Sequence, residues 1–495
     1  MILEDLLLFF MQAVYIVSLF GLAIYGLNNL VTTVLFLRTR IPHKRPELPA
    51  DHETWPFVTI QLPVFNERFT VERLLSAISR LDYPRSRLEV QVLDDSTDDT
   101  TLLIRRLVDQ IKSTGLSIEM LHRVDRIGFK AGAMNEGLKK AHGDLIAVFD
   151  ADFVPPANWL IKAVPEFQSP NVGCLQTRWG HLNSASSTFT RAQALGIDGH
   201  FVIEQTARSY NNLFMNFNGT AGIWRRTCIE DAGGWQSDTL TEDLDLSYRA
   251  QMRGWHIGYL PDVVVPAELP AQIEAFKVQQ FRWAKGSFQT VKKLFPQIVK
   301  TNVPLKVRWM ALVHITGYFV HPLMLITLIM LLPIGLFAPH TLKMFPWTTI
   351  AGFGPPFMYM VTRSETAPRL WDRVKLLPFL VLMGFGLSLN NSIAVFEGLF
   401  GKKRGTFVRT PKYSLTNEKS RIEKSFYSMT ISPMIWGEIF LIAYSLLTIF
   451  VLTPVIGWET IPCVLIYTAG YGYMVLMNLW QSIEVKQPHP IAAHL

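Results

Sequence analysis

Long apolar runs lie near both ends of the 495-residue chain, and a long polar stretch without such a run lies between them. The runs cover residues 6–37, 309–337, 345–361, 376–400, 434–452 and 461–480. A helix that crosses a bilayer needs about 20 apolar residues, and residues 38–308 contain no run of that length. The sequence therefore predicts one globular domain inserted between membrane segments.

The net charge of +7 is concentrated beside the apolar runs rather than spread over the chain. Basic residues gather at 38–45, 292–308, 363–375 and 402–424, which is the positive-inside pattern of a membrane protein and gives no reason to expect a nucleic-acid partner. If all four segments are cytosolic, the N-terminus lies outside and 376–400 does not cross the membrane. Five spans and a cytosolic globular domain follow, with the lipid bilayer as a partner.

Residues 376–400 allow two topologies. Asn390, Asn391 and Glu397 make the second half amphipathic, which favours an interfacial or re-entrant helix, and the alternative is a true span that exports 402–424. The first apolar run has no basic region before it and exceeds the core of a signal peptide, so it is expected to be a retained anchor.

The expected domains are an N-terminal anchor (1–40), a cytosolic catalytic domain (41–307) and two spans plus the interfacial helix (308–400). A basic loop (401–428) and two further spans with a tail (429–495) complete the chain. The three cysteines, Cys174, Cys228 and Cys463, lie far apart and predict neither a disulfide framework nor a zinc site.

The polar stretch alternates between strand and helix patterns. Strands are expected at 57–62, 88–93, 118–121 and 145–149, and helices at 71–80, 100–112 and 133–141. This alternation predicts an α/β domain with a parallel-rich sheet and helices on both faces. Ligands bind such sheets beyond the carboxyl ends of the strands, and neither a GxGxxG nor a P-loop pattern follows the first strand.

Asp150 and Asp152 follow the last of these strands, and alternate residues of an extended chain face the same side. Two carboxylates that lie so near to each other favour a bound cation. Their oxygen ligands suit Mg²⁺ or Mn²⁺, which would bridge to a substrate diphosphate. The alternative is a solvated acidic turn at a strand end.

Two further motifs lie near the same sheet edge. Asp94 and Asp95 either cap the next helix or contact a nucleotide. Lys130 is flanked by glycines in GFKAGAMN and expected to precede a short helix, where it either meets an anion or belongs to a flexible surface loop.

Two helical segments supply the remaining candidates. Asp243 in Thr-Glu-Asp either belongs to an ordinary helix start or is the general base that takes a proton from an acceptor hydroxyl, in a displacement that inverts the anomeric carbon. Gln279 and Arg282 share one helix face. Arg282 suits a diphosphate and Trp283 a sugar ring, although the same helix could lie on anionic lipid.

Together these motifs resemble the processive family-2 glycosyltransferases, and within them the cellulose-synthase-like mannan and glucan synthases. The matching pieces are DDS at 94–96, FKAGAMN around Lys130, DAD at 150–152, QTRW at 176–179, FNGTAG at 217–222, TED at 241–243 and QQFRW at 279–283. The resemblance implies an α/β type-A nucleotide-sugar transferase domain, a divalent metal and inverting chemistry.

The resemblance also implies roles that the residues alone do not suggest. The expected acceptor-binding residues are Trp179, Phe217, Asn218, Gly219, Thr220 and Glu242. The segment Phe407-Val408-Arg409-Thr410-Pro411-Lys412 is similar to the FxVTxK gating loop of cellulose synthases, with Arg409 in place of a valine. Phe407, Thr410 and Lys412 are the expected gating residues, and a basic cytosolic loop is the simpler reading.

The expected function is polymerisation of a β-1,4-linked polysaccharide such as mannan, glucomannan or glucan from GDP-mannose or UDP-glucose. One alternative is transfer of a single sugar to a membrane lipid. Another is a transporter or scaffold without catalysis, which would bury ionisable residues within its spans. Few such residues occur there, and they are His314, His321, Glu397 and Glu438.

Overall fold

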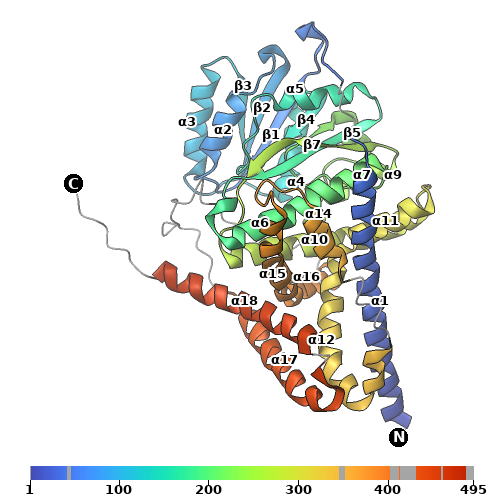
Figure 1. The fold of residues 1–495 in the computed structure, drawn as a ribbon. Coiled ribbons are helices and arrows are strands. Elements are labelled where there is room, and N and C mark those ends of the chain that lie inside the picture. Colours follow the sequence, from blue (N-terminus) through green and yellow to red (C-terminus); the bar gives the residue numbers. More distant parts are fainter. Residues whose placement is uncertain are drawn as a thin grey trace.

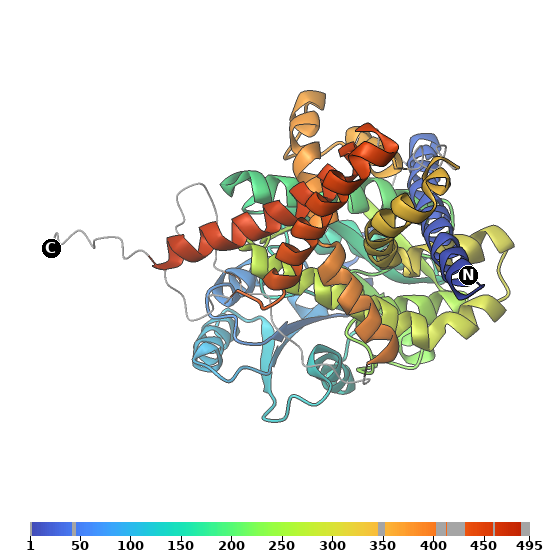
Figure 2. The same cartoon turned by 90° about the horizontal axis from the view of Figure 1, so that it is seen from below.

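The computed structural model describes residues 2–41, 46–344, 352–401, 412, 431–458 and 461–486. A sheet with helices on both faces forms one end of the molecule, and long apolar helices extend from it toward the other end (Figure 1). In the view from below, the N-terminal helix and the C-terminal helices lie in front of the sheet (Figure 2).

Seven strands form the sheet in the order β3-β2-β1-β4-β6-β5-β7. The strands are β1 (Val58–Val64), β2 (Leu88–Asp94), β3 (Ser117–His122), β4 (Leu145–Val148), β5 (Val172–His181), β6 (Gly222–Arg225) and β7 (His256–Ala267). All pairs are parallel except those of β6, which runs antiparallel to β4 and β5. The expected parallel-rich α/β sheet is therefore confirmed.

Alternating residues of the central strands pack into two separate cores, one on each face of the sheet. Ile60 and Ala147 belong to the core on one face, whereas Ile146 and Val148 belong to the core on the other. The first face is covered by α2 (Val71–Ser79), α3 (Thr100–Lys112) and α5 (Trp159–Ala163). The second is covered by α4 (Phe129–Lys140), α8 (Arg226–Asp231) and α9 (Glu242–Met252). Both faces are buried, so β4 is wholly apolar, and the buried glutamines of β1 and β2 bond to each other, with Gln61 Nε2 donating to Gln91 Oε1 (3.1 Å).

Helices between the strands and the membrane segments form the base of the domain. They are α6 (Thr188–Asp198), a π-helical stretch at Gly199–Gln205, α7 (Thr206–Tyr210), α10 (Ile273–Lys300) and α11 (Leu305–Ile315). The longest of them, α10, contacts α9 on the catalytic side and α16 (Ser388–Phe400) on the membrane side. It therefore joins the two halves of the molecule.

Four helices are long and apolar enough to cross a membrane, within the part of the chain that the structure describes. They lie in α1 (Ile2–Arg38), α12 (Val320–Phe337), α17 (Ile435–Ile456) and α18 (Ile461–Lys486). The pair α15 (Leu370–Gly386) and α16 is bent by 44° and is a broken span or a re-entrant loop. The expected membrane association is confirmed, and the number of spans stays a prediction.

Two expected membrane segments differ in detail. The run at 309–337 is not one helix, because α11 ends at Ile315 and the apolar candidate span begins at Gly317. Met310 and Ala311 of α11 pack instead with the base of the catalytic domain. Of the run at 345–361, the structure describes α14 (Gly354–Val361), while 345–351 lie outside the described residues.

Candidate active site

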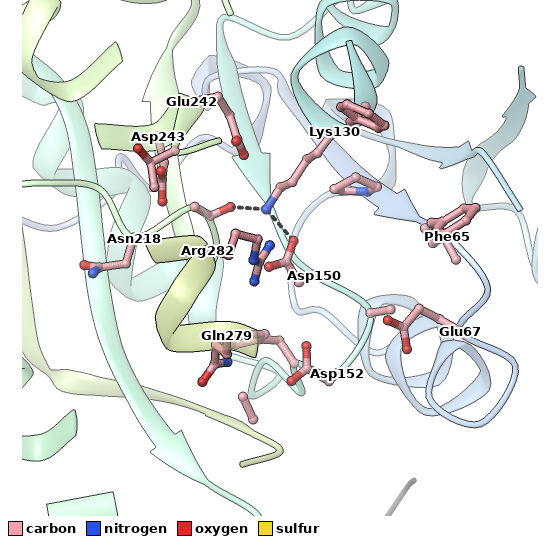
Figure 3. A pocket seen from close by; sticks show the side chains of 18 of the residues that line it. Phe65, Glu67, Lys130, Asp150, Asp152, Asn218, Glu242, Asp243, Gln279 and Arg282 are labelled. Carbon is pink, nitrogen blue, oxygen red and sulfur yellow. Dashed lines mark hydrogen bonds and ion pairs between the residues drawn. The ribbon is translucent and has the colours of Figure 1, made fainter. Parts of the chain in front are cut away.

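A cavity of about 220 Å³ opens at the carboxyl ends of the central strands, between the sheet and α10 (Figure 3). Segments far apart in the sequence supply its walls. Among its lining residues are Asp95, Lys130, Asp150, Asp152, Trp179, Asn218, Gly219, Glu242, Asp243, Gln279, Arg282, Trp283 and Lys412. Most of the residues that the sequence singles out thus line one cavity.

The two carboxylates of the DAD segment face the cavity just beyond β4. The backbone N–H of Asp150 donates to the hydroxyl of Thr220 (2.9 Å), which fixes the turn that carries the carboxylates. Each carboxylate has an ammonium partner: Lys130 lies 2.5 Å from Asp150, and Lys412 lies 2.8 Å from Asp152. These cations balance a strongly acidic edge of the sheet.

Lys130 belongs to the first turn of α4, because that helix begins at Phe129. The expectation that the lysine precedes the helix is wrong, since the helical hydrogen bonds already start at Gly128, whose carbonyl accepts from Gly132 N–H. The ammonium also donates to the Gly219 carbonyl (2.9 Å). Burial lowers the pKa of Lys130, but the nearby carboxylates, Asp150 first, outweigh burial and raise this pKa above its usual value.

Asp243 and Glu242 open α9 and point into the cavity beside Lys130 (Figure 3). Burial raises the pKa of Asp243 to about 7, and the neighbouring Glu242 adds to this shift. Burial likewise raises the pKa of Glu242, opposed by Lys130. A carboxyl group whose pKa lies near neutrality can accept a proton in one step and release it in the next.

Gly219 allows residues 217–222 to approach Asp243 closely. Its φ is +80°, and a Cβ atom there would lie 2.9 Å from Asp243 Oδ2. Any larger residue would both strain the backbone and push the carboxylate away. A polar group approaching over Gly219 would therefore reach Asp243 directly.

Helix α10 forms the wall opposite the sheet. Gln279, Arg282 and Trp283 follow one another at i, i+3 and i+4, and all three line the cavity. Figure 3 shows Arg282 pointing toward the carboxylates of the DAD segment. A guanidinium at this place can donate hydrogen bonds to a phosphate group, and that phosphate can also bind a cation held by Asp150 and Asp152.

Asp94 and Asp95 have different surroundings. The Asp94 carboxylate is fully buried and accepts from the Ser96 N–H (3.0 Å) and the Thr101 hydroxyl (2.8 Å), with His122 Nδ1 at 2.8 Å. It does not line the cavity. Asp95 does, and it accepts two hydrogen bonds from Arg123, of 2.8 and 2.6 Å. Asp94 thus shapes the loop that presents Asp95.

The expected acceptor residues also divide into two groups. Trp179, Asn218, Gly219 and Glu242 line the cavity, whereas Phe217 and Thr220 lie beneath it. Phe217 is fully buried and packs edge-on against Trp224. Thr220 acts through the Asp150 N–H described above. Phe407 and Thr410 lie outside the described residues.

A polar network beneath Asn218 holds the orientation of its amide. Gln205 Nε2 donates to Asn218 Oδ1 (2.6 Å), and Asn218 Nδ2 lies 3.0 Å from His200 Nε2. His200 Nδ1 in turn lies 2.9 Å from Glu204 Oε2. Because Nδ2 can only donate, His200 Nε2 must accept, and its proton lies on Nδ1 toward Glu204. Gln205, His200 and Glu204 all come from the π-helical stretch, which sequence reasoning missed.

Arginines after β3 are the other residues that the sequence analysis missed. Arg123 binds Asp95, as described above, and Arg126 lines the cavity with its guanidinium 3.3 Å from the centre of the Phe65 ring. The available signal was positional, since both arginines follow a strand that the sequence predicts, at the edge where ligands bind. A flat base or sugar can stack at this end of the cavity.

The carboxylates fit a divalent cation that the substrate helps to hold. No group of three or more His, Cys, Asp and Glu side chains arranged for a metal occurs among the described residues. Asp150 and Asp152 can supply two oxygen ligands, so the others must come from a diphosphate and water. Mg²⁺ is usually bound in this way, by one or two carboxylates plus substrate phosphates.

Comparison with a solved structure identifies the fold class. The mannosyltransferase PcManGT from Pyrobaculum calidifontis, in complex with GDP-Man and Mn²⁺, superposes with a TM-score of 0.54 at 21% identity. The match covers 79% of this chain and 99% of that one. The catalytic domain therefore has the type-A glycosyltransferase fold that the sequence predicts.

Comparisons of sequence give the family. The model described as "Glycosyltransferase like family 2" matches residues 56–286. Glucomannan 4-beta-mannosyltransferase 2 of Arabidopsis thaliana is 34% identical over 394 residues, which cover 75% of this chain and 71% of that protein. Probable glucomannan 4-beta-mannosyltransferase 9 of Oryza sativa subsp. japonica is 35% identical over 367 residues, covering 72% and 68%.

The chain belongs to glycosyltransferase family 2 and is a hexosyltransferase. The family expected from the motifs is thereby confirmed, and the expectation of a transferase that builds β-linked polysaccharide is confirmed at the level of the family. The reading as a transporter or scaffold without catalysis has no support in these comparisons.

Proposed function

We propose that the protein transfers mannose from GDP-mannose to the end of a growing β-1,4-linked mannan or glucomannan chain. The names of its relatives support this donor and product, and the structural neighbour of the same fold binds GDP-Man. The observation that carries the proposal is that Asp95, Asp152, Asp243 and Arg282 line a single cavity.

The proposed roles follow from the positions of the side chains. Asp95 faces the nucleoside, and Arg282 and Gln279 hold the diphosphate from α10. Asp150 and Asp152 hold a divalent cation, Mg²⁺ or Mn²⁺, which would neutralise charge on the departing diphosphate. Lys130 keeps Asp150 in place and ties it to the Gly219 carbonyl.

Asp243 is the proposed general base. It takes the proton from an acceptor hydroxyl whose oxygen forms a bond to the anomeric carbon, while the bond from that carbon to the diphosphate breaks and GDP leaves. Attack and departure on opposite faces invert the anomeric carbon. Asn218 and Trp179 are proposed to hold the acceptor, with Trp179 offering a flat surface to a sugar ring.

The proposed topology is a cytosolic catalytic domain with the N-terminus on the other side of the membrane. The contacts of α15 and α16 support a re-entrant or interfacial pair, because Leu376 packs against Leu195 of α6 and Ala394 against Ala284 of α10. Both helices thus contact the base of the catalytic domain.

Purified protein should be offered GDP-mannose and UDP-glucose in parallel with Mn²⁺, with product size and linkage analysed. We expect GDP-mannose to yield β-1,4-linked oligomers or polymers. Exclusive use of UDP-glucose would contradict the donor assignment, and a single sugar on lipid would show the alternative, glycolipid-forming activity.

A further inference from the structure

A buried ion pair connects α10 to a membrane helix just before the residues that face the cavity. Lys277 Nζ lies 2.7 Å from Glu438 Oε1, and the two side chains are 2% and 0% exposed. Glu438 lies in the first turn of α17, within a candidate membrane span. Ionisable residues in such segments are rare and usually functional.

Lys277 lies on the opposite side of α10 from the cavity residues. Lys277, Phe281, Ala284 and Phe288 recur at i, i+4, i+7 and i+11, which is one stripe of a helix. Phe281, Ala284 and Phe288 pack with Ala394 and Val395 of α16. Apolar contacts of this kind hold α10 against α16, and hydrogen bonds and ion pairs add direction to the contact.

Polar contacts from three membrane helices supply that direction at the start of α10. Besides Glu438, Asn390 of α16 donates to the Lys277 carbonyl (3.1 Å). The Gln481 side chain of α18 accepts from the Ile273 N–H (2.8 Å) and donates to the Ala271 carbonyl (3.2 Å). All of these contacts precede Gln279 by fewer than ten residues, so they set the rotation of the face that carries Arg282.

We propose that the Lys277–Glu438 ion pair is a positioning device for the diphosphate-binding face of α10. It acts through Arg282 and touches no substrate itself. A buried ion pair is weak evidence for added stability, because removal from water costs both charges much of what their attraction returns. A role in orienting Arg282 explains better than added stability why two charges lie at the contact between α10 and α17. The inference rests on the proposed role of Arg282.

The test is a double-mutant cycle on GDP affinity, measured by calorimetry with Mn²⁺ in detergent. Glu274 Oε1 also lies 3.3 Å from Lys277 Nζ, and its side chain is 8% exposed. One arm is therefore Lys277→Met combined with Glu438→Leu and Glu274→Gln, which leaves no buried carboxylate unpaired and keeps volume, so the protein should fold. The other arm is Arg282→Ala. We expect each arm to weaken GDP binding about tenfold or more, since small misplacements of binding groups are costly.

The combined variant separates positioning from packing. If the ion pair acts through Arg282, the pair substitution should weaken GDP binding no further once Arg282 is alanine. Additive losses would overturn the proposal, as would GDP affinity and donor KM within twofold of wild type in the folded pair variant. If that variant does not fold, Glu438→Gln, which keeps the side-chain shape, is put through the same cycle.

Lys285 and Glu397 provide a control ion pair on the same helix, α10. They join α10 to α16 at 2.7 Å, but their side chains are 14% and 46% exposed. Lys285→Met with Glu397→Leu should leave GDP affinity within twofold of wild type. Unchanged GDP affinity in Arg282→Ala would instead refute the role of Arg282 in the proposed function, which is a different result from a pair variant that binds normally.

Discussion

At the scale of single residues, the proposed metal-binding pair and the proposed base lie on different elements. Asp150 and Asp152 lie beyond β4 with ammonium partners, whereas Asp243 lies on α9 beside Glu242. The ammonium groups offset the negative charge of the first two carboxylates, whereas burial and then the neighbouring Glu242 raise the pKa of Asp243 to about 7. Aspartates in different surroundings can thus serve two purposes in one cavity.

Substitutions of Asp243 and Asp152 should have different effects on kcat and on GDP binding. Asp243→Asn should lower kcat by about 10²- to 10⁴-fold, the usual contribution of a general base, and leave GDP binding with Mn²⁺ unchanged. Asp152→Asn should weaken Mn²⁺-dependent GDP binding, because a metal ligand is lost. Calorimetry of both variants checks this, and equal GDP affinities would contradict the assignment.

The rate should depend on pH through Asp243. With a pKa of about 7, this carboxyl is the ionised base above pH 7 and is protonated below. With Mn²⁺ and acceptor saturating, kcat/KM for the donor should fall about tenfold per pH unit below 7 and level off above it. A flat profile between pH 5.5 and 8 would exclude this group as the base.

The same shift predicts an effect on stability. A raised pKa in the folded state means that protonation of Asp243 favours folding, so this contribution is present at low pH and is lost as pH rises through 7. Asp243→Asn should therefore raise Tm relative to wild type more at pH 8 than at pH 5. Thermal unfolding in detergent measures the difference.

At the scale of elements, α10 lies against the segment that carries the base. Gly286 makes this contact possible, because a Cβ atom there would lie 2.6 Å from Thr241 Cγ2 and 2.9 Å from the Thr241 backbone nitrogen. Thr241 directly precedes Glu242 and Asp243. The distance between the proposed diphosphate-binding face of α10 and the proposed base, Asp243, therefore depends on the absence of a side chain at Gly286.

Gly286→Ala should separate α10 from Thr241 and move Arg282 relative to Asp243. We expect kcat to fall at least tenfold and the protein to lose about 1–3 kcal/mol of stability, the usual cost of overpacking. Gly384→Ala in α15 is the control, since nothing lies within 4 Å of a Cβ atom there. It should have normal activity and equal or higher Tm, because alanine favours helix.

At the scale of the whole molecule, the catalytic domain and the membrane helices occupy opposite ends. The N-terminus and the junction of α17 with α18 lie at the end farthest from the sheet (Figure 1). Trp458 at this junction is 78% exposed, and Val124 on the catalytic domain is 91% exposed. If α1, α12, α17 and α18 cross a bilayer, these two residues lie on opposite sides of it.

Cysteine labelling in sealed vesicles tests this arrangement. Cys463 is changed to serine as background, since Cys174 and Cys228 are buried and Cys463 is exposed. In vesicles of uniform orientation, a membrane-impermeant maleimide should label either Trp458→Cys or Val124→Cys, and the other only after permeabilisation. Labelling of both from one side would disprove the topology.

The sequence by itself determined the first four strands of the sheet and the family. The strands at 57–62, 88–93 and 145–149 agree with β1, β2 and β4 within two residues at each end, because a buried strand is apolar either throughout, as in β4, or at alternate positions, as in β1 and β2. Once the strands are recognised, the acidic motifs that follow them can be placed together, because parallel strands have their carboxyl ends at one edge of the sheet. Neighbours in sequence largely fix both features.

Only the tertiary structure decided which members of a motif reach the cavity. Asp94 and Asp95 are adjacent, yet one is buried against Thr101 and His122 and the other faces the site. Likewise the Lys277–Glu438 pair joins residues 161 positions apart. Side-chain direction and long-range contacts depend on how elements pack, and a single sequence carries no local signal for them.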